Sequence, residues 1–127
     1  MARKEFSLCG KTFEELQRMS TDEFAQLLPA RERRSLKRER PELHKKVLEH
    51  IKANRKNIRT HARDMVITPD MAGITMKVYN GKDWTTIVIE KEMLGHRLGE
   101  FALTRKKVAH SAPGVGATRS SAALSVR

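Results

Sequence analysis

Residues 74–89 read ITMKVYNGKDWTTIVI and carry the strongest structural signal in the sequence. The first six side chains of this stretch alternate between two faces with a period of two, and its last six form a second extended run. The Asn80-Gly81 pair between the runs is a turn signal. A four-residue loop keeps apolar side chains opposite one another, whereas a two-residue loop would put Val78 opposite Asp83. We therefore expect a β-hairpin that pairs Tyr79 with Trp84, Met76 with Ile87 and Ile74 with Ile89.

A short apolar run and a pair of glycines flank this hairpin. Residues 65–67 (MVI) are apolar, and the turn signal TPD at 68–70 closes the run. Residues 92–101 (EMLGHRLGEF) are typical of one helical turn followed by a tight bend. Gly95 and Gly99 could cradle a phosphate, but the lysine-serine signature of such loops is missing. We expect them to allow tight turning or the close approach of another backbone, which in an RNA-binding protein includes RNA.

The region before the hairpin carries helix signals. Ser20, followed three residues later by Glu23, is a capping-box pattern. Pro29 is expected to end that helix or to begin the next one, and Pro41 to open another. The apolar stripe of the Pro41 helix is Leu43, Val47, Leu48 and Ile51. Because most lysines fall off that stripe, the helix can pack on an apolar surface while it presents cations outward.

Charge indicates the class of partner. The chain has 127 residues, enough for one domain, with 26 lysines and arginines against 15 acidic residues, a net charge of +11. Residues 31–63 hold 13 basic and 4 acidic groups, residues 97–127 hold 6 and 1, and residues 64–96 hold 3 and 5. The excess of cations in residues 31–63 and 97–127 indicates a polyanion partner. The alternatives are a solvated helical face and a membrane-surface or calmodulin-target helix, whose expected aromatic anchor the apolar stripe lacks.

The sequence shows no pattern typical of catalysis or metal binding. None of the five histidines forms a zinc-protease pair or has a nucleophile beside it, and Cys9 has no second cysteine. We expect no enzyme, cofactor, metal site or small-molecule substrate. The alternative is a small nuclease that uses His61 or His96 with Asp64. No apolar run is long enough to span a membrane, and residues 1–13 lack a signal-peptide stretch, so we expect a cytoplasmic protein.

Residues 59–105 closely resemble the universal small-subunit ribosomal protein family numbered nineteen, whose eukaryotic counterparts are numbered fifteen. The most specific elements are Asn80-Gly81-Lys82, Gly95-His96-Arg97-Leu98-Gly99-Glu100-Phe101 and Thr104-Arg105. The match begins near Leu43, and the parts outside it are similar to archaeal and eukaryotic extensions. The short link before Arg59 favours the archaeal type. Bacterial members usually carry tryptophan at the position of His61 and proline at the position of Leu103. A contact that depends on the tryptophan ring or on the proline kink is therefore not implied for this chain.

The resemblance implies an α+β fold, a small three-stranded mixed or antiparallel sheet with a packed helix. Residues 41–110 would be the RNA-binding domain, and residues 1–40 a helical N-terminal extension. Residues 111–127 are rich in glycine, alanine and serine, a composition typical of a flexible tail that orders only when it binds RNA.

The resemblance also implies a structural constituent of the small ribosomal subunit. It would bind small-subunit rRNA in the head, beside the protein numbered thirteen, near the intersubunit bridge and the aminoacyl-tRNA site, where the tail would meet tRNA and the large subunit. A free-standing nucleic-acid-binding regulator that uses the Pro41 helix for recognition is the rival interpretation. The residues expected to bind rRNA are Arg31, Arg33, Arg34, Lys37, Arg38, Lys45, Lys46, Lys52, Arg55, Lys56, Arg59, His61, Arg63, Asn80, Lys82, His96, Arg97, Arg105, Lys106, Lys107, His110 and Arg119.

Overall fold

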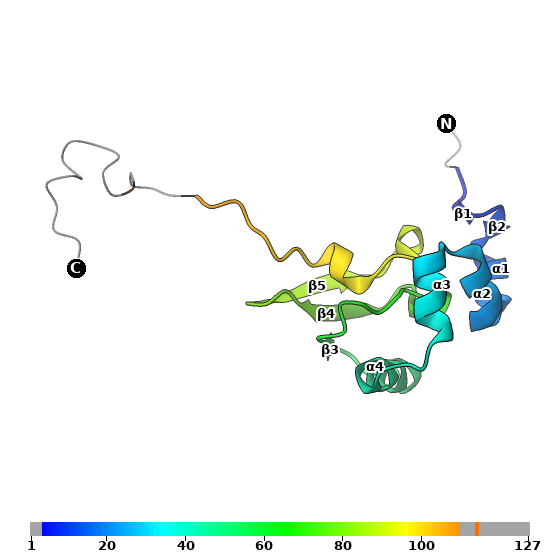
Figure 1. The fold of residues 1–127 in the computed structure, drawn as a ribbon, viewed down its shortest axis with the longest axis horizontal. Helices are drawn as coiled ribbons and strands as arrows, with labels where there is room; N and C mark the ends of the chain where they lie inside the picture. Colours follow the sequence, from blue (N-terminus) through cyan, green and yellow to red (C-terminus); the bar gives the residue numbers. More distant parts are fainter. Residues whose placement is uncertain (1–3, 110–113, 115–127) are drawn as a thin grey trace, which may run out of the picture.

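A computed structural model describes residues 4–109 and residue 114 (Figure 1). His110 lies outside the described residues, as do all residues of the expected tail at 111–127, Arg119 among them, except Gly114. In chain order the elements are β1 (Ser7–Leu8), β2 (Lys11–Thr12), α1 (Phe13–Arg18), α2 (Thr21–Leu27), α3 (Ala30–Lys37), α4 (Glu42–Lys52), β3 (Ile58–Thr60), η1 (Pro69–Met71), β4 (Thr75–Tyr79), β5 (Trp84–Val88), η2 (Lys91–Met93) and η3 (Leu98–Phe101), where η marks a 3₁₀ helix. The expected α+β fold is confirmed.

The predicted hairpin, β4 and β5, is part of a mixed three-stranded sheet ordered β3-β4-β5. Strand β4 pairs antiparallel with β5, and β3 lies parallel to β4 on its other side. The predicted register is confirmed by the pairs Tyr79–Trp84 and Met76–Ile87 and by the Ile89 N–H, which donates to the Ile74 carbonyl oxygen at 3.0 Å. At three residues, β3 is too short for a periodic pattern to reveal it.

The side chain of Asn80 holds the four-residue hairpin loop. Its Oδ1 accepts hydrogen bonds from the backbone N–H of Lys82 at 3.0 Å and of Asp83 at 2.7 Å. The Asn80 N–H donates to the carbonyl oxygen of Asp83 at 3.0 Å, which closes the loop. Gly81 has a φ of +103°, a conformation that side-chain-bearing residues rarely adopt. The turn signal therefore works through an asparagine cap and a glycine conformation together.

Helices α2, α3 and α4 begin where the sequence signals predict. The Ser20 Oγ accepts from the Glu23 N–H at 3.3 Å, and Glu23 Oε2 accepts from the Ser20 N–H at 3.0 Å, so the capping box of α2 is confirmed. Pro29 is the N-cap of α3, and Pro41 is the N-cap of α4. Asn54, with a φ of +49°, follows the last turn of α4 in the left-handed conformation that commonly ends a helix.

The buried face of α4 differs from prediction at one residue. Val47 is 3% exposed, and Leu48 and Ile51 pack against the core, as expected. Leu43, however, is 51% exposed, and the side chain of His44, at 15%, faces inward instead. The inward residues therefore follow helical i, i+3, i+4, i+7 spacing from position 44, and Leu43 falls beyond the edge of that arc.

The hydrophobic core joins the sheet to the N-terminal helices. Met76 and Val78 of β4 are fully buried on its inner face. Leu16 of α1, Phe24 of α2 and Leu28 after it belong to the same cluster of buried residues. Figure 1 shows α1, α2 and α3 grouped at one end of the molecule, away from the tip of the hairpin. The helices of residues 13–37 thus complete the core rather than stand apart from it.

The glycine-containing segment runs beside residues 63–67. The N–H of Gly95 donates to Ile67 O at 3.0 Å, and that of Gly99 donates to Arg63 O at 2.8 Å. Gly95 has a φ of +81°, and a Cβ there would lie 2.6 Å from Leu28 Cδ2. A Cβ on Gly99 would lie 3.0 Å from both the Cβ and the carbonyl oxygen of Arg63. The glycines allow close approach, and the group that approaches them is the protein itself.

Candidate nucleic-acid interface

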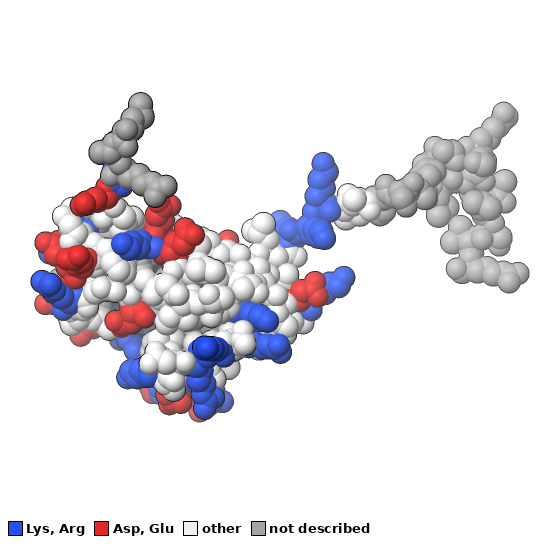
Figure 2. All heavy atoms as spheres, turned by 180° about the vertical axis from the view of Figure 1, so that it is seen from behind, with Lys and Arg blue, Asp and Glu red and all other residues white. Residues whose placement is uncertain are grey.

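The outward face of α4 and the turn after it carry five of the predicted RNA-binding side chains. All five are exposed: Lys45, Lys46, Lys52, Arg55 and Lys56. Of these five cations, only Lys45 has a carboxylate partner among the described residues, Glu39, at 3.6 Å. Figure 2 shows lysine and arginine side chains predominating toward the bottom of the molecule, where Figure 1 places α4, and acidic side chains gathering near the N-terminal end. Apart from Lys45, these cations can meet phosphates without first breaking an ion pair within the described part of the chain.

Helix α3 presents a second basic surface. Its predicted residues Arg31, Arg34, Lys37 and Arg38 are exposed. Residues 31, 34 and 38 lie on one face of the helix by their spacing, and they line a groove together with Arg97. Guanidinium groups with five donors each suit bidentate contacts to phosphate oxygens.

Arg63 is turned into the protein. Its Nη1 donates to the carbonyl oxygen of Tyr79 at 2.7 Å, and its Nη2 donates to those of Gly99 at 2.9 Å and Ala102 at 2.6 Å. These bonds tie the end of β4 to the segment after η2 and satisfy three carbonyl groups. Arg63 therefore clamps the fold, and its part in the RNA interface stays a prediction.

Two other predicted arginines are half-buried and also engaged internally. Arg97 donates from Nη1 to the carbonyl oxygen of Asp64 at 2.7 Å and from Nη2 to Ser35 Oγ at 2.8 Å, and its Nε lies 3.7 Å from Glu32 Oε1. Arg33 donates to the carbonyl oxygen of Leu28 at 3.1 Å. Arg97 thus connects α3 to the segment that follows the sheet.

The remaining predicted residues are spread over the molecule. Lys82 at the hairpin tip is exposed, as are Arg105, Lys106 and Lys107 after η3. His96 Nδ1 lies 2.7 Å from Glu100 Oε2, so its ring is held by a neighbouring carboxylate. Asn80 uses its Oδ1 to hold the hairpin loop, as described above.

An aromatic cluster lies on the outer face of the sheet, and sequence patterns identified only one of its members as a candidate. The exposed ring of His61 lies 4.7 Å from the ring of Tyr79 and 5.0 Å from that of Trp84, centroid to centroid. The Tyr79 and Trp84 rings are 5.2 Å apart, and the Arg59 guanidinium lies 5.8 Å from the Trp84 centroid. The predicted register already places Tyr79 beside Trp84, so the sequence could have indicated this pair as a candidate. The position of His61 next to them follows only from the tertiary structure.

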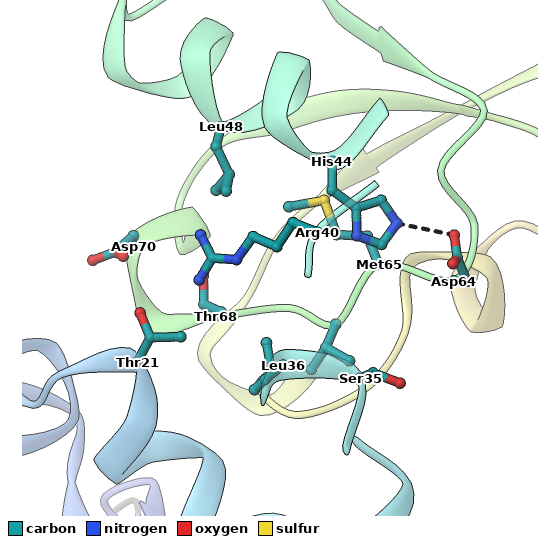
Figure 3. Close-up of a pocket in the computed structure, with 11 residues that line it drawn as sticks. Thr21, Ser35, Leu36, Arg40, His44, Leu48, Asp64, Met65, Thr68 and Asp70 are labelled. Atoms are coloured by element: carbon teal, nitrogen blue, oxygen red, sulfur yellow. Dashed lines mark hydrogen bonds and ion pairs between the residues drawn. The ribbon is translucent and has the colours of Figure 1, made fainter. Parts of the chain in front are cut away.

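The nuclease alternative is not supported by the geometry. Asp64 contacts His44, with Nε2 to Oδ1 at 3.1 Å, rather than His61 or His96. The hydrogen bond with His44 is the main reason that the pKa of Asp64 lies below its ordinary value of 3.8, although partial burial acts in the opposite direction. Figure 3 shows this pair at the rim of a cavity of about 50 Å³ between α3, α4 and the segment before η1, room for little more than water.

Two further features bear on function. The described residues hold no group of three or more histidine, cysteine, aspartate or glutamate side chains placed to bind a metal ion. Within that same part of the chain, every helix is too short or too polar to cross a membrane. The features that stand out are therefore the basic surfaces of α3 and α4 and the aromatic cluster.

The fold and these surfaces are those of a small basic α+β protein, a class whose exposed cations are typical of nucleic-acid binders. Comparison with known proteins names the family: the family described as Ribosomal protein S19 matches residues 33–110. The small ribosomal subunit protein uS19 of Methanocella arvoryzae is 48% identical over 119 residues, which cover 94% of this chain and 85% of that protein. The uS19 protein of Thermoplasma volcanium is 52% identical over 118 residues, 93% of this chain and 78% of that protein. The chain belongs to the ribosomal protein S19 family.

This membership confirms the resemblance seen in the hairpin and the glycine segment. Both relatives come from archaea and are named as small ribosomal subunit proteins, in line with the expected archaeal type. The chain is a ribosomal protein and not an enzyme.

Proposed function

We propose that this ribosomal protein is a structural constituent of the small subunit and binds small-subunit rRNA through the outward faces of α3 and α4. The observation that carries the proposal is the set of five exposed cations on α4 and the turn after it, of which only Lys45 has a carboxylate partner among the described residues. Lysine and arginine at such positions neutralise phosphates and release counterions, which favours binding.

The chemistry is that of shape recognition. Folded RNA presents phosphates and 2′-hydroxyls more readily than base edges in its narrow major groove. Two helices with cations on their outward faces, held at fixed positions by one core, match a pattern of phosphates rather than a base sequence. Internal bonds such as those of Arg63 and Arg97 keep the helices and the sheet in place while the surface cations bind.

We extend the proposal to the location of the protein. The family resemblance supports a place in the head of the small subunit, beside the protein numbered thirteen and near the intersubunit bridge and the aminoacyl-tRNA site. Residues 111–127 would reach tRNA and the large subunit there. Sedimentation of the native protein with small subunits, and crosslinks to the protein numbered thirteen, are the expected results. A protein that stays at the top of the gradient, under conditions that preserve subunits, would instead favour the free-standing regulator.

The RNA-binding surface can be tested by salt dependence. The double variant Arg55→Gln/Lys56→Gln removes two exposed cations, neither of which makes an ion pair among the described residues. The slope of log affinity against log salt concentration is negative, and each lost phosphate contact should reduce its magnitude by roughly 0.7 to 0.9. The loss of two contacts should therefore reduce the magnitude by about 1.4 to 1.8. Affinity for small-subunit rRNA is measured by fluorescence anisotropy at several potassium chloride concentrations.

The matched control is Lys4→Gln/Arg18→Gln, which removes two exposed cations from the region before α2. Its salt slope should equal that of the unmodified chain. If both double variants lower the slope equally, binding is a diffuse charge effect and the assignment to α4 is wrong. If the unmodified chain shows no affinity for small-subunit rRNA, the proposed function itself is wrong.

A further inference from the structure

The described residues leave the outer face of the three-stranded sheet uncovered, and the strands of this sheet carry no acidic side chain. The register places together Arg59 and His61 from β3 and its end, Thr75, Lys77 and Tyr79 from β4, and Trp84, Thr86 and Val88 from β5. The opposite face carries buried residues, among them Met76 and Ile87. Of the outer residues, five are exposed: Arg59, His61, Thr75, Thr86 and Val88. Figure 1 shows the hairpin end of the sheet pointing away from α1, α2 and α3.

The charge of this face is opposite to that of the segment around it. Residues 64–96 carry 3 basic and 5 acidic groups, yet the strands β4 and β5 contain no acidic residue, and Lys77 lies on the outer face. Arg59 adds a second cation from β3, directly opposite Lys77 in the parallel register. The acidic residues of the segment lie before, between and after these two strands, outside the sheet. A sheet face that excludes acidic side chains in this way is complementary to phosphate.

Three rings and a guanidinium stand together on this face. His61, Tyr79 and Trp84 lie within 5.2 Å of one another, centroid to centroid, and Arg59 lies 5.8 Å from the Trp84 ring. The Tyr79 hydroxyl donates to the carbonyl oxygen of Gly81 at 2.9 Å, so the ring is tied to the hairpin turn. Rigid, partly exposed rings beside cations are the features with which proteins stack unpaired bases of RNA.

Resting on the proposed rRNA binding, we infer that this sheet face is a second contact, where an unpaired base of the rRNA stacks on the cluster of His61, Tyr79 and Trp84. Arg59 and Lys77 neutralise the phosphates on either side of that base. The contact differs in kind from the one made by α4: it binds a base plane, tolerates different base identities, and depends little on salt for its stacking part.

The chain contains a natural reporter for this contact. Trp84 is its only tryptophan, so the intrinsic tryptophan fluorescence of the full chain reports on this face alone. Titration with small-subunit rRNA should quench that fluorescence at the same RNA concentration at which anisotropy reports binding. Ultraviolet irradiation of assembled small subunits should crosslink RNA to a peptide that contains His61, Tyr79 or Trp84.

Two variants measure the effect of stacking. Trp84→Leu keeps an apolar side chain but removes the stacking surface, and it should raise the dissociation constant for rRNA by about 5- to 150-fold, with the salt slope unchanged. His61→Ala removes an exposed ring at little risk to folding, and it should weaken binding by at least about 5-fold, again at constant slope. Far-ultraviolet circular dichroism verifies that both variants are folded.

The control is Phe13→Leu, which changes an aromatic residue whose ring lies 4.7 Å from Lys91 Nζ, outside the sheet. It should leave rRNA affinity unchanged. The inference is overturned if rRNA binds to the unmodified chain while Trp84 fluorescence and the affinity of His61→Ala stay unchanged. It is equally overturned if Trp84 crosslinks in subunits to protein rather than RNA. Either result leaves the proposed function standing, because that function is tested by the α4 variants.

Discussion

At the scale of single residues, similar side chains in one basic zone have different tasks. Arg55 is exposed, whereas Arg63 donates to three backbone carbonyls from segments up to 39 positions away in the chain. A guanidinium can reach three acceptors in a fixed geometry, and an ammonium cannot match that arrangement. Net charge therefore identifies the zone but does not separate its exposed cations from those that, like Arg63, bond within the fold.

Arg63→Lys should test the clamp. The substitution preserves the charge but leaves at least one of the three carbonyl groups without its donor, so we expect a loss of about 1.5 to 3 kcal/mol in unfolding free energy. Urea unfolding followed by Trp84 fluorescence measures this loss. The control Arg55→Lys should change the unfolding free energy by less than about 0.5 kcal/mol. Equal stability of the two variants would contradict the assigned role of Arg63.

At the scale of elements, α4 has two faces with separate tasks. Its outward side carries exposed lysines, and its inward side packs Val47 against the core and brings His44 to Asp64. On the buried face lies His44, where the sequence pattern predicts Leu43. A polar ring at the edge of an apolar face is stable there because a carboxylate from residues 61–67 is its partner.

The His44–Asp64 pair predicts an effect of acid on stability. Because the pKa of Asp64 is lowered in the folded protein, its contribution is fully present above the ordinary value of 3.8 and is lost as the pH falls below it. The Asp64 side chain is 69% exposed, so solvent screening limits the contribution to less than about 1 kcal/mol. Asp64→Asn should be slightly less stable than the unmodified chain at pH 6, and the difference should shrink below pH 3.8.

Urea unfolding at pH 6, 4 and 3 measures that difference. Asp83→Asn, at the exposed hairpin loop, is the control, and its difference from the unmodified chain should not follow the same pH course. A difference for Asp64→Asn that grows as the pH falls would have the wrong sign and would contradict the pair.

At the scale of the whole molecule, one core joins regions that differ in composition. Phe24 of α2 is 1% exposed and shares a cluster of buried residues with Met76 of β4. Gly95 lies against Leu28 and Gly99 against Arg63, so the segment after the sheet is also enclosed in this packing. The basic surfaces of α3 and α4 are consequently held at fixed positions relative to the sheet.

Phe24→Ala should test this unity. Removal of a fully buried ring costs about 3 to 5 kcal/mol, and one shared core should make the helices and the sheet unfold together. Circular dichroism at 222 nm, which reports helix, and Trp84 fluorescence, which reports the sheet, should therefore shift to the same lower midpoint in urea. Leu43→Ala, at a 51% exposed position, should leave both midpoints nearly unchanged. A shift in the helix signal alone would show that the helices are an independent unit.

Features that depend on near neighbours along the chain can be predicted from the sequence alone. The register of the hairpin follows from alternation and from the Asn80 turn, and the capping box of Ser20 marks the start of α2, because each signal acts within a few residues. The basic character of residues 31–63 is likewise a property of composition.

Tertiary packing sets which side chains of that zone face inward and which distant residues come into contact. The bonds of Arg63 to Gly99 and Ala102, the inward turn of His44 in place of Leu43, and the meeting of His61 with Trp84 all join segments separated by 20 or more positions. Such contacts depend on how whole elements pack, and the energies that select this packing arise only once the core has formed.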